Sequence, residues 1–146
     1  MSSTFHGRDV FAPVAAHLAR GDDWTEVGPV IAEPVRLPLR PATVDAQGLH
    51  GQVIAIDGPY GNLITDVDAT IFAQLGYAPG DKVPVRLAGR TIDVPLAHTF
   101  SDVPRGAPLL FIDSRGHVGL ALNHESFARR YKVTVPSSLA IPRKAR

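Results

Sequence analysis

The sequence contains no cysteine among its 146 residues, which excludes disulfide bonds, thiolate metal sites and cysteine nucleophiles. An excess of one charge sign is also missing. The 15 Lys and Arg residues and 14 Asp and Glu residues leave a formal net charge of +1. So weak a field gives no indication of a nucleic-acid partner or of an acidic surface partner.

Long hydrophobic runs are missing as well. No stretch approaches the roughly 20 apolar residues that a membrane span requires. The first residues, MSSTFHGRDVFAP, carry charges where a signal peptide needs an apolar run. We therefore expect a soluble, cytoplasmic protein with no membrane partner. The apolar share of 45% is enough for the core of one domain.

The first part of the chain predicts a single amphipathic helix. Apolar side chains recur at helical spacing in FHGRDVFAPVAAHLAR, residues 5–20. Pro13 near its start and Gly21 at its end are typical helix boundaries. We expect this helix to occupy residues 1–21 with little nearby sequence to cover its apolar stripe, which then needs another partner.

The rest of the chain predicts a connecting segment and a β-domain. Residues 22–50 carry four prolines, which block a helix and favour an extended segment. Residues 51–146 contain six short β-runs: QVIAID, LITDV, KVPVRLA, RTIDVPLA, PLLFID and HVGLAL. The expected fold class is therefore mainly β, with a small closed or nearly closed C-terminal β-barrel.

Two short helices are expected to interrupt the barrel. Asp68 is placed to cap ATIFAQL, and HESFARRY follows Asn123. The basic residues form one local cluster, in the tail at Arg143, Lys144 and Arg146, which is typical of a solvated chain end.

The stretch IDGPYGN brings an acid, an aromatic ring and an amide onto one turn. Asp57 ends a β-run, Tyr60 lies on the turn, and Asn62 begins the next run. An amide can read the edge of adenine, an aromatic ring can stack on a base, and a carboxylate can bind an ammonium or a ribose hydroxyl. The alternative is a purely structural turn, in which Asp57 and Asn62 shape the backbone and Tyr60 fills the core.

Two further clusters can carry chemistry. Phe100 in TFSDVPRG offers a second stacking face, and Ser114 with Arg115 in IDSRGH can bind a carboxylate, although an ordinary hairpin turn is equally consistent. His6 lies just before the helix, where a neutral imidazole can accept or orient a proton of water, or play a structural part. The other histidines lack metal-ligand spacing, so we expect no metal site.

These clusters, in this order, resemble the S-adenosyl-L-methionine (SAM) hydroxide adenosyltransferases, also called SAM hydrolases, and the related fluorinases. The resemblance is carried by STFHGRDVFAPVAAHLARG, HGQVIAIDGPYGNLITDV and HTFSDVPRGAPLLFIDSRGHVGLALN. It implies binding of SAM and delivery of a nucleophile to the ribose C5′. With water the products are adenosine and L-methionine, and fluorinases use a halide. SAM is then a substrate, and no cofactor is implied.

The resemblance also implies a role for each candidate residue. His6 matches the histidine that positions and activates water, and Asp57 matches an acid at the methionine or sugar end. Tyr60 and Phe100 match the aromatics that flank adenine, and Asn62 matches the amide at its edge. Ser114 and Arg115 match the turn that holds methionine. Asn123 and His124 match the strand end whose main chain contacts adenine.

One departure from the family is large. Family members carry an α/β N-terminal domain, and this sequence matches only the end of that domain before the complete barrel. We therefore expect the chain to be inactive alone. A homotrimer, or complementation by a separate N-terminal half, would complete the site. The alternatives are a non-catalytic module that binds SAM or adenosine, or a purely structural barrel.

Overall fold

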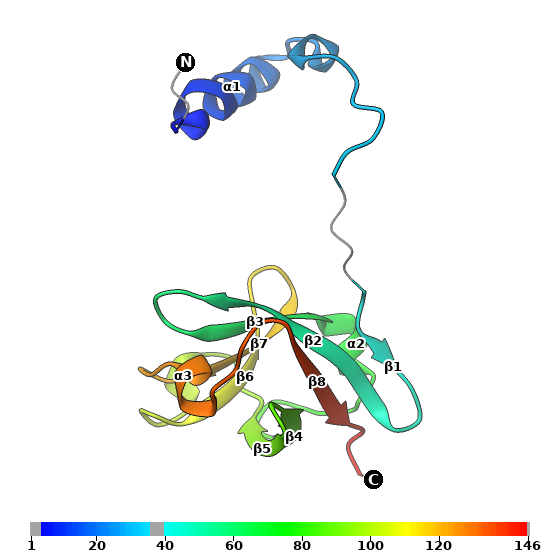
Figure 1. The fold of residues 1–146 in the computed structure, drawn as a ribbon, viewed down its shortest axis with the longest axis vertical. Coiled ribbons are helices and arrows are strands. Elements are labelled where there is room, and N and C mark those ends of the chain that lie inside the picture. The colour runs from blue at the N-terminus through cyan, green and yellow to red at the C-terminus, as the bar shows by residue number, and fades with distance from the viewer. Residues whose placement is uncertain (1–3, 36–39, 146) are drawn as a thin grey trace. The chain divides into compact units, whose positions relative to one another are not determined.

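The computed structural model describes residues 4–35 and 40–145. The chain divides into two compact units, one ending at residue 38 and the other beginning at residue 39. We describe each unit separately, and both appear in Figure 1.

The first unit is built around the predicted amphipathic helix. A π-helical turn, η1 (Gly7–Phe11), runs directly into α1 (Ala12–Arg20). Pro13 lies in the first turn of α1, and Gly21 ends it in a left-handed conformation with φ of 95°, as expected for a glycine after a helix. A short 3-10 helix, η2 (Trp24–Val27), follows. Within this unit, no residue of the three helices is buried.

The second unit is one eight-stranded antiparallel sheet that curls into a nearly closed barrel (Figure 1). Its order is β5-β4-β8-β2-β3-β7-β6, with β1 paired to β2. The sheet almost closes between β5 and β6, where the N–H of Ala97 donates to the carbonyl of Leu110 at 2.9 Å. The strands are β1 (Thr43–Val44), β2 (Gly48–Asp57), β3 (Asn62–Asp68), β4 (Lys82–Leu87), β5 (Arg90–Pro95), β6 (Pro108–Ile112), β7 (His117–Leu122) and β8 (Ser137–Pro142).

The mainly β fold class is confirmed, and all six predicted β-runs are strands. Two strands were not predicted from the sequence, β1 and the central β8. Residues 43–50 belong to the sheet through β1 and the start of β2, although the proline pattern places them in the connecting segment.

The barrel interior is filled by alternating apolar residues. In β4, Val83, Val85 and Leu87 are buried while their neighbours face outward, the pattern of a strand with one covered face. Thr65 is a buried polar residue that lies where the pairing of β3 with β7 is irregular, and its side chain bonds main-chain groups there. Its hydroxyl donates to the carbonyl of Val118 at 2.6 Å and accepts from the N–H of Val67 at 3.2 Å. The buried core consists mainly of leucine and valine from every strand of the barrel except β1.

Two short helices pack against the core of the barrel. The carboxylate of Asp68 accepts the N–H of Thr70 at 2.7 Å and caps α2 (Ala69–Ala73), as predicted. The second helix, α3 (Phe127–Tyr131), is shorter than predicted because Ser126 is its cap. His124 takes a left-handed conformation with φ of 62°, so the backbone turns before the helix starts.

Arg143 and Lys144 of the basic tail are exposed, as expected of a solvated chain end, and they also bond to the barrel. The guanidinium of Arg143 donates to the carbonyls of Asp45 and Gln74, at 3.0 and 2.9 Å. Lys144 forms an ion pair with Asp81 at 2.5 Å. These bonds connect the end of β8 to the loop that contains Asp45 and to the loop that contains Gln74 and Asp81. Arg146 lies outside the described residues.

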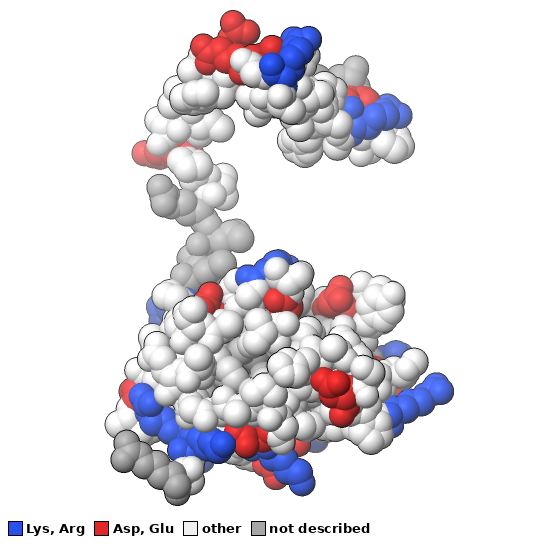
Figure 2. Space-filling view, turned by 180° about the vertical axis from the view of Figure 1, so that it is seen from behind, with Lys and Arg blue, Asp and Glu red and all other residues white. Residues whose placement is uncertain are grey.

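Charged side chains are spread over the described surface. On the side drawn in Figure 2, blue and red atoms lie close to one another, mostly along the edges of a largely white barrel face. This distribution agrees with the near-zero net charge and shows no extended field of one sign on that side.

Candidate functional site

Two adjoining grooves of the barrel collect the residues predicted to bind substrate. The first, which we call the hairpin groove, has a volume of about 720 Å³. The second, the turn groove, has a volume of about 440 Å³. The hairpin groove is lined by residues that include Asp57, Tyr60, Asn62, Phe100, Asn123 and His124. The turn groove is lined by residues that include Asp57, Asn62, Phe100, Phe111, Ser114 and Arg115.

The β2–β3 hairpin forms the shared wall of the two grooves. Its turn is closed by the N–H of Gly61, which donates to the carbonyl of Asp57 at 2.6 Å. Gly61 has φ of 73°, and a Cβ there would lie 2.0 Å from the hydroxyl oxygen of Ser126. The N–H of Ala128 donates to the carbonyl of Gly61 at 3.0 Å. Only glycine therefore fits the turn, and α3 holds it in place.

Asp57 and Asn62 are directly opposite one another where β2 ends and β3 begins. The side-chain amide of Asn62 is partly exposed and forms no hydrogen bond with any described residue. An amide has two donors and an acceptor, so Asn62 can bind a ligand without giving up an internal bond. Tyr60, at the tip of the turn, is 68% exposed. The structural-turn interpretation requires Tyr60 to fill the core, and this exposure contradicts it.

Phe100 is held beside this hairpin by a rigid loop. It begins the 3-10 helix η3 (Phe100–Asp102), which Thr99 and Asp102 close with a reciprocal capping box. The N–H groups of Thr99 and His98 each donate to Asp102 at 2.9 Å and keep the pKa of that carboxyl below its usual range. The Phe100 ring packs on Phe111, with centroids 5.4 Å apart, and remains 38% exposed. One of its faces is therefore available in the grooves.

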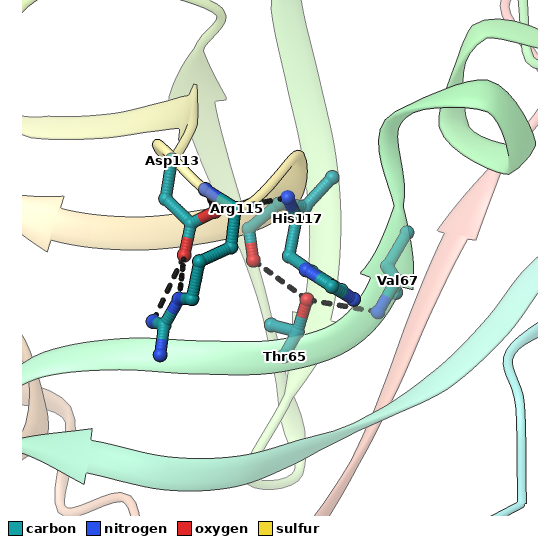
Figure 3. A network of polar contacts seen from close by, with 6 residues as sticks. Thr65, Val67, Asp113, Arg115 and His117 are labelled. Atoms are coloured by element: carbon teal, nitrogen blue, oxygen red, sulfur yellow. Dashed lines mark hydrogen bonds and ion pairs between the residues drawn. The ribbon is translucent and has the colours of Figure 1, made fainter. Parts of the chain in front are cut away.

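The β6–β7 turn is organised around Asp113 (Figure 3). One carboxylate oxygen accepts the N–H groups of Arg115 and His117, at 2.8 and 3.0 Å. The other accepts two guanidinium N–H groups of Arg115, at 3.1 and 3.0 Å. Partial burial raises the pKa of Asp113, but the bonds from His117 and Arg115 together lower it below its ordinary value.

This pairing changes what the turn can offer a ligand. Because Asp113 neutralises the Arg115 guanidinium, the turn presents no net positive charge. The hydroxyl of Ser114 forms no hydrogen bond with a described residue and lines the turn groove. Ser114 and the unused guanidinium N–H groups are therefore the donors that a carboxylate would meet.

The polar groups of Asn123 are engaged within the fold. Its side-chain amide donates to the carbonyl of Val103 at 2.8 Å. Its main-chain N–H donates to Ala107, and its carbonyl accepts from Gly106. Asn123 thus fixes the loop that carries Phe100, and the next residue, His124, presents its exposed side chain to the hairpin groove.

His6 belongs to the first unit, whereas the residues of both grooves belong to the second. Its backbone is already helical and its side chain is exposed. Residues 4–35 and 40–145 contain no cluster of three metal-ligating side chains. Within the same ranges, every helix is too short or too polar to cross a bilayer.

The grooves also contain residues that the motifs did not single out. Glu125 and Arg129 line the hairpin groove, and Phe111 and Asp113 line the turn groove. Glu125 forms an ion pair with Arg130. The sequence does contain a pattern that predicts the role of Asp113, because the aspartate of an Asp-Ser-Arg-Gly turn commonly accepts the main-chain N–H two residues further on.

The fold and the two grooves define the class of structure. It is a nearly closed β-barrel with a cleft lined by polar and aromatic residues. Residues 51–139 match the model of the SAM hydroxide adenosyltransferase C-terminal domain, and residues 1–28 match the model of the N-terminal domain. The first match covers more than half of the chain. The chain therefore belongs to the SAM hydroxide adenosyltransferase family.

Named relatives include both SAM hydrolases and fluorinases. The chain is 36% identical over 146 residues to an (R)-S-adenosyl-L-methionine hydrolase from Salinispora arenicola, covering 97% of this chain and 51% of the relative. It is 36% identical over 135 residues to a fluorinase from an Actinoplanes species, covering 89% and 45%. It thus spans about half the length of these relatives.

A solved structure supports the same relationship. An uncharacterized conserved protein from Thermotoga maritima matches with a TM-score of 0.77 and 33% identity, covering 98% of this chain and 54% of that one. A second match, a conserved hypothetical protein from Thermus thermophilus, has a TM-score of 0.59 and 34% identity, covering 93% and 52%.

Proposed function

We propose that this chain is the adenosine-binding part of a SAM hydrolase, which converts SAM and water to adenosine and L-methionine. The observation that carries the proposal is the convergence of Asn62 and Phe100 on the same two grooves. Neither side chain is buried. A partner-free amide and an exposed ring in one cleft are what an adenine base requires.

The two grooves divide the substrate between them. The hairpin groove takes the adenine, with Tyr60 and Phe100 as stacking faces and Asn62 at the base edge. The turn groove takes the methionine portion, with its ammonium at Asp57 and its carboxylate at Ser114. Asp57 lines both grooves, which supports a ribose position between them in this proposal. The Asp113–Arg115 turn carries no net charge, so the methionine carboxylate meets hydrogen-bond donors there and no unpaired cation.

Attack at C5′ suits such a site. A water molecule loses a proton to solvent and attacks the carbon as hydroxide, the C5′–S bond breaks with its electron pair going to sulfur, and methionine leaves as a neutral thioether. The charge of the sulfonium is cancelled during the reaction, so an environment that excludes water favours the transition state. Aromatic faces stabilise the cation without offering a competing nucleophile. His6 is the residue that orients the water in this proposal.

The active assembly needs more than the described barrel. The apolar side chains of the first unit are exposed, with Phe11 at 68% and Trp24 at 73%. Exposed apolar surface of this kind marks an interface. We propose that a homotrimer, or an N-terminal half supplied as a separate polypeptide, covers this surface and completes the water site around His6.

Product analysis tests the proposal. The purified chain is incubated with SAM, alone and with the N-terminal half of the Salinispora arenicola hydrolase relative, and adenosine and methionine are measured by mass spectrometry. We expect turnover in the mixture and little in the chain alone. His6→Ala should abolish that turnover while adenosine binding persists.

Two alternatives are separated by the same measurement. Adenosine binding without turnover in either mixture would leave a non-catalytic SAM-binding or adenosine-binding module. A halide reaction is a candidate because the Actinoplanes fluorinase and the Salinispora hydrolase match at the same identity, 36%. Adding fluoride and finding 5′-fluoro-5′-deoxyadenosine in place of adenosine would establish it.

A further inference from the structure

A third groove lies on the outer face of the barrel and shares no lining residue with the hairpin and turn grooves. Its volume is about 720 Å³, within the range of small-molecule sites. It runs across β4, β8 and β2, which lie side by side in the sheet (Figure 1). We call it the arginine groove, because Arg40, Arg86 and Arg90 line it.

The strand register explains why there is a groove here. Thr91, Arg86, Ala140, His50 and Thr43 are successive partners across β5, β4, β8, β2 and β1. Directly opposed residues of antiparallel strands project from the same face. The methyl group of Ala140 is therefore a low floor between two long walls, Arg86 and His50. Two strand spacings separate those walls by about 10 Å, which leaves room for a ligand.

The three arginines have no charge partner in this part of the fold. The guanidinium groups of Arg40, Arg86 and Arg90 form no ion pair or hydrogen bond with any residue in the ranges 4–35 and 40–145. Several arginines elsewhere do have such partners, since Arg8, Arg20, Arg115 and Arg130 each pair with a carboxylate. Three partner-free arginines are thus gathered at the groove although the chain as a whole is close to neutral.

Acidic groups neutralise this cluster only in part. The one carboxylate among the described lining residues is Asp66, and one of its oxygens accepts the N–H of Gln52 at 2.7 Å. Asp45 pairs with the His50 imidazole at 3.3 Å and does not line the groove. Three guanidinium groups and one carboxylate leave the groove lining with an excess of positive charge, so an anion that binds there lowers the free energy of the folded state.

We infer that the arginine groove binds a small polyvalent anion through phosphate or carboxylate groups. Guanidinium groups recognise both through paired N–H donors. The arginines come from three segments, namely the residues before β1, strand β4 and the start of β5. A polyvalent anion can therefore bridge elements that are distant in the sequence. This site is independent of the proposed SAM site.

Calorimetric titration with inorganic pyrophosphate and with citrate tests the inference and distinguishes phosphate from carboxylate chemistry. The intact chain should bind at least one of them saturably, with affinity that falls as salt increases. The double variant Arg86→Gln/Arg90→Gln should lose about tenfold or more in affinity. Arg105→Gln is the matched control, because Arg105 is exposed, lacks a described partner and lines none of the three grooves.

A steric variant locates the site without changing charge. Ala140→Leu fills the floor and should weaken anion binding, and thermal unfolding confirms that each variant is folded. Adenosine titration should give the same affinity for the intact chain and all of these variants, which keeps this test separate from the proposed SAM site. Absence of saturable binding of both anions would overturn the inference. An equal loss in Arg105→Gln would also overturn it, by showing non-specific attraction.

Discussion

The replacement Phe100→Ala should remove a stacking face from the hairpin groove. The ring is 38% exposed and contacts Phe111 at a centroid distance of 5.4 Å. Stacking of a base on an aromatic side chain contributes roughly 1–3 kcal/mol. The dissociation constant for adenosine should therefore increase about 5-fold to 150-fold, as measured by isothermal titration calorimetry.

The fold should survive this change. The loop around Phe100 is held by the Thr99–Asp102 capping box, which Phe100→Ala leaves intact. Losing the contact between the two rings costs about 0.5–1.5 kcal/mol beyond the buried area. Urea denaturation should show this modest decrease in the free energy of unfolding, and the cooperative transition should remain.

Two control variants make the result specific. Phe100→Trp retains a stacking face and should bind adenosine with similar affinity. Val135→Ala removes an apolar side chain that is 42% exposed and lines none of the three grooves, so it should have no effect on binding. If folded Phe100→Ala binds adenosine as tightly as the unchanged chain, Phe100 does not contact the base and our assignment of the groove is wrong.

Other consequences can be measured in the same way. Asn62→Ala should weaken adenosine binding by about 1–3 kcal/mol through a lost hydrogen bond, and unchanged affinity in calorimetry would remove Asn62 from the site. Gly119→Ala places a Cβ 2.7 Å from the Phe111 ring, so urea denaturation should show a loss of about 1–3 kcal/mol. Thr65→Val should cost about 1–3 kcal/mol because it leaves buried backbone groups without a partner, whereas Thr65→Ser should largely preserve stability. The pKa of Asp113 is lower in the folded chain than in the unfolded chain. Its contribution to stability is therefore complete above the unfolded-state pKa, about 3.9, and is lost as the pH falls through the lower folded value. Asp113→Asn should make the acid-induced loss of stability less steep when unfolding is measured between pH 2 and pH 6.

Local signals in the sequence predicted much of the barrel. Alternating apolar residues identified six strands, and Asp68 and Gly21 marked helix ends through chemistry that acts over a few residues. Strand β8 was missed because Pro136 precedes it directly, Pro142 is its last residue, and it contains only a short apolar run. It becomes a strand because β2 and β4 pair with it on both sides, and such long-range pairing leaves no local pattern.

The site was predictable in its residues but not in its geometry. The motifs named Asn62 and Phe100, and barrel curvature brings both to the same grooves. They did not show that the Arg115 guanidinium is already paired with Asp113, because a turn folds back on itself in a way that spacing alone does not determine. Nor did they show the arginine groove, since Arg40 is far from Arg86 and Arg90 in the sequence and lines the same groove only because the sheet folds.

The central position of β8 has a consequence for synthesis on the ribosome. Strands β2 and β4 are made well before residues 137–142, yet β8 lies between them. While the ribosome still holds those residues, the nascent chain exposes two hydrogen-bonding edges that only β8 satisfies. Closure of the barrel therefore follows translation of β8, and until then the exposed edges are available to chaperones or to aggregation.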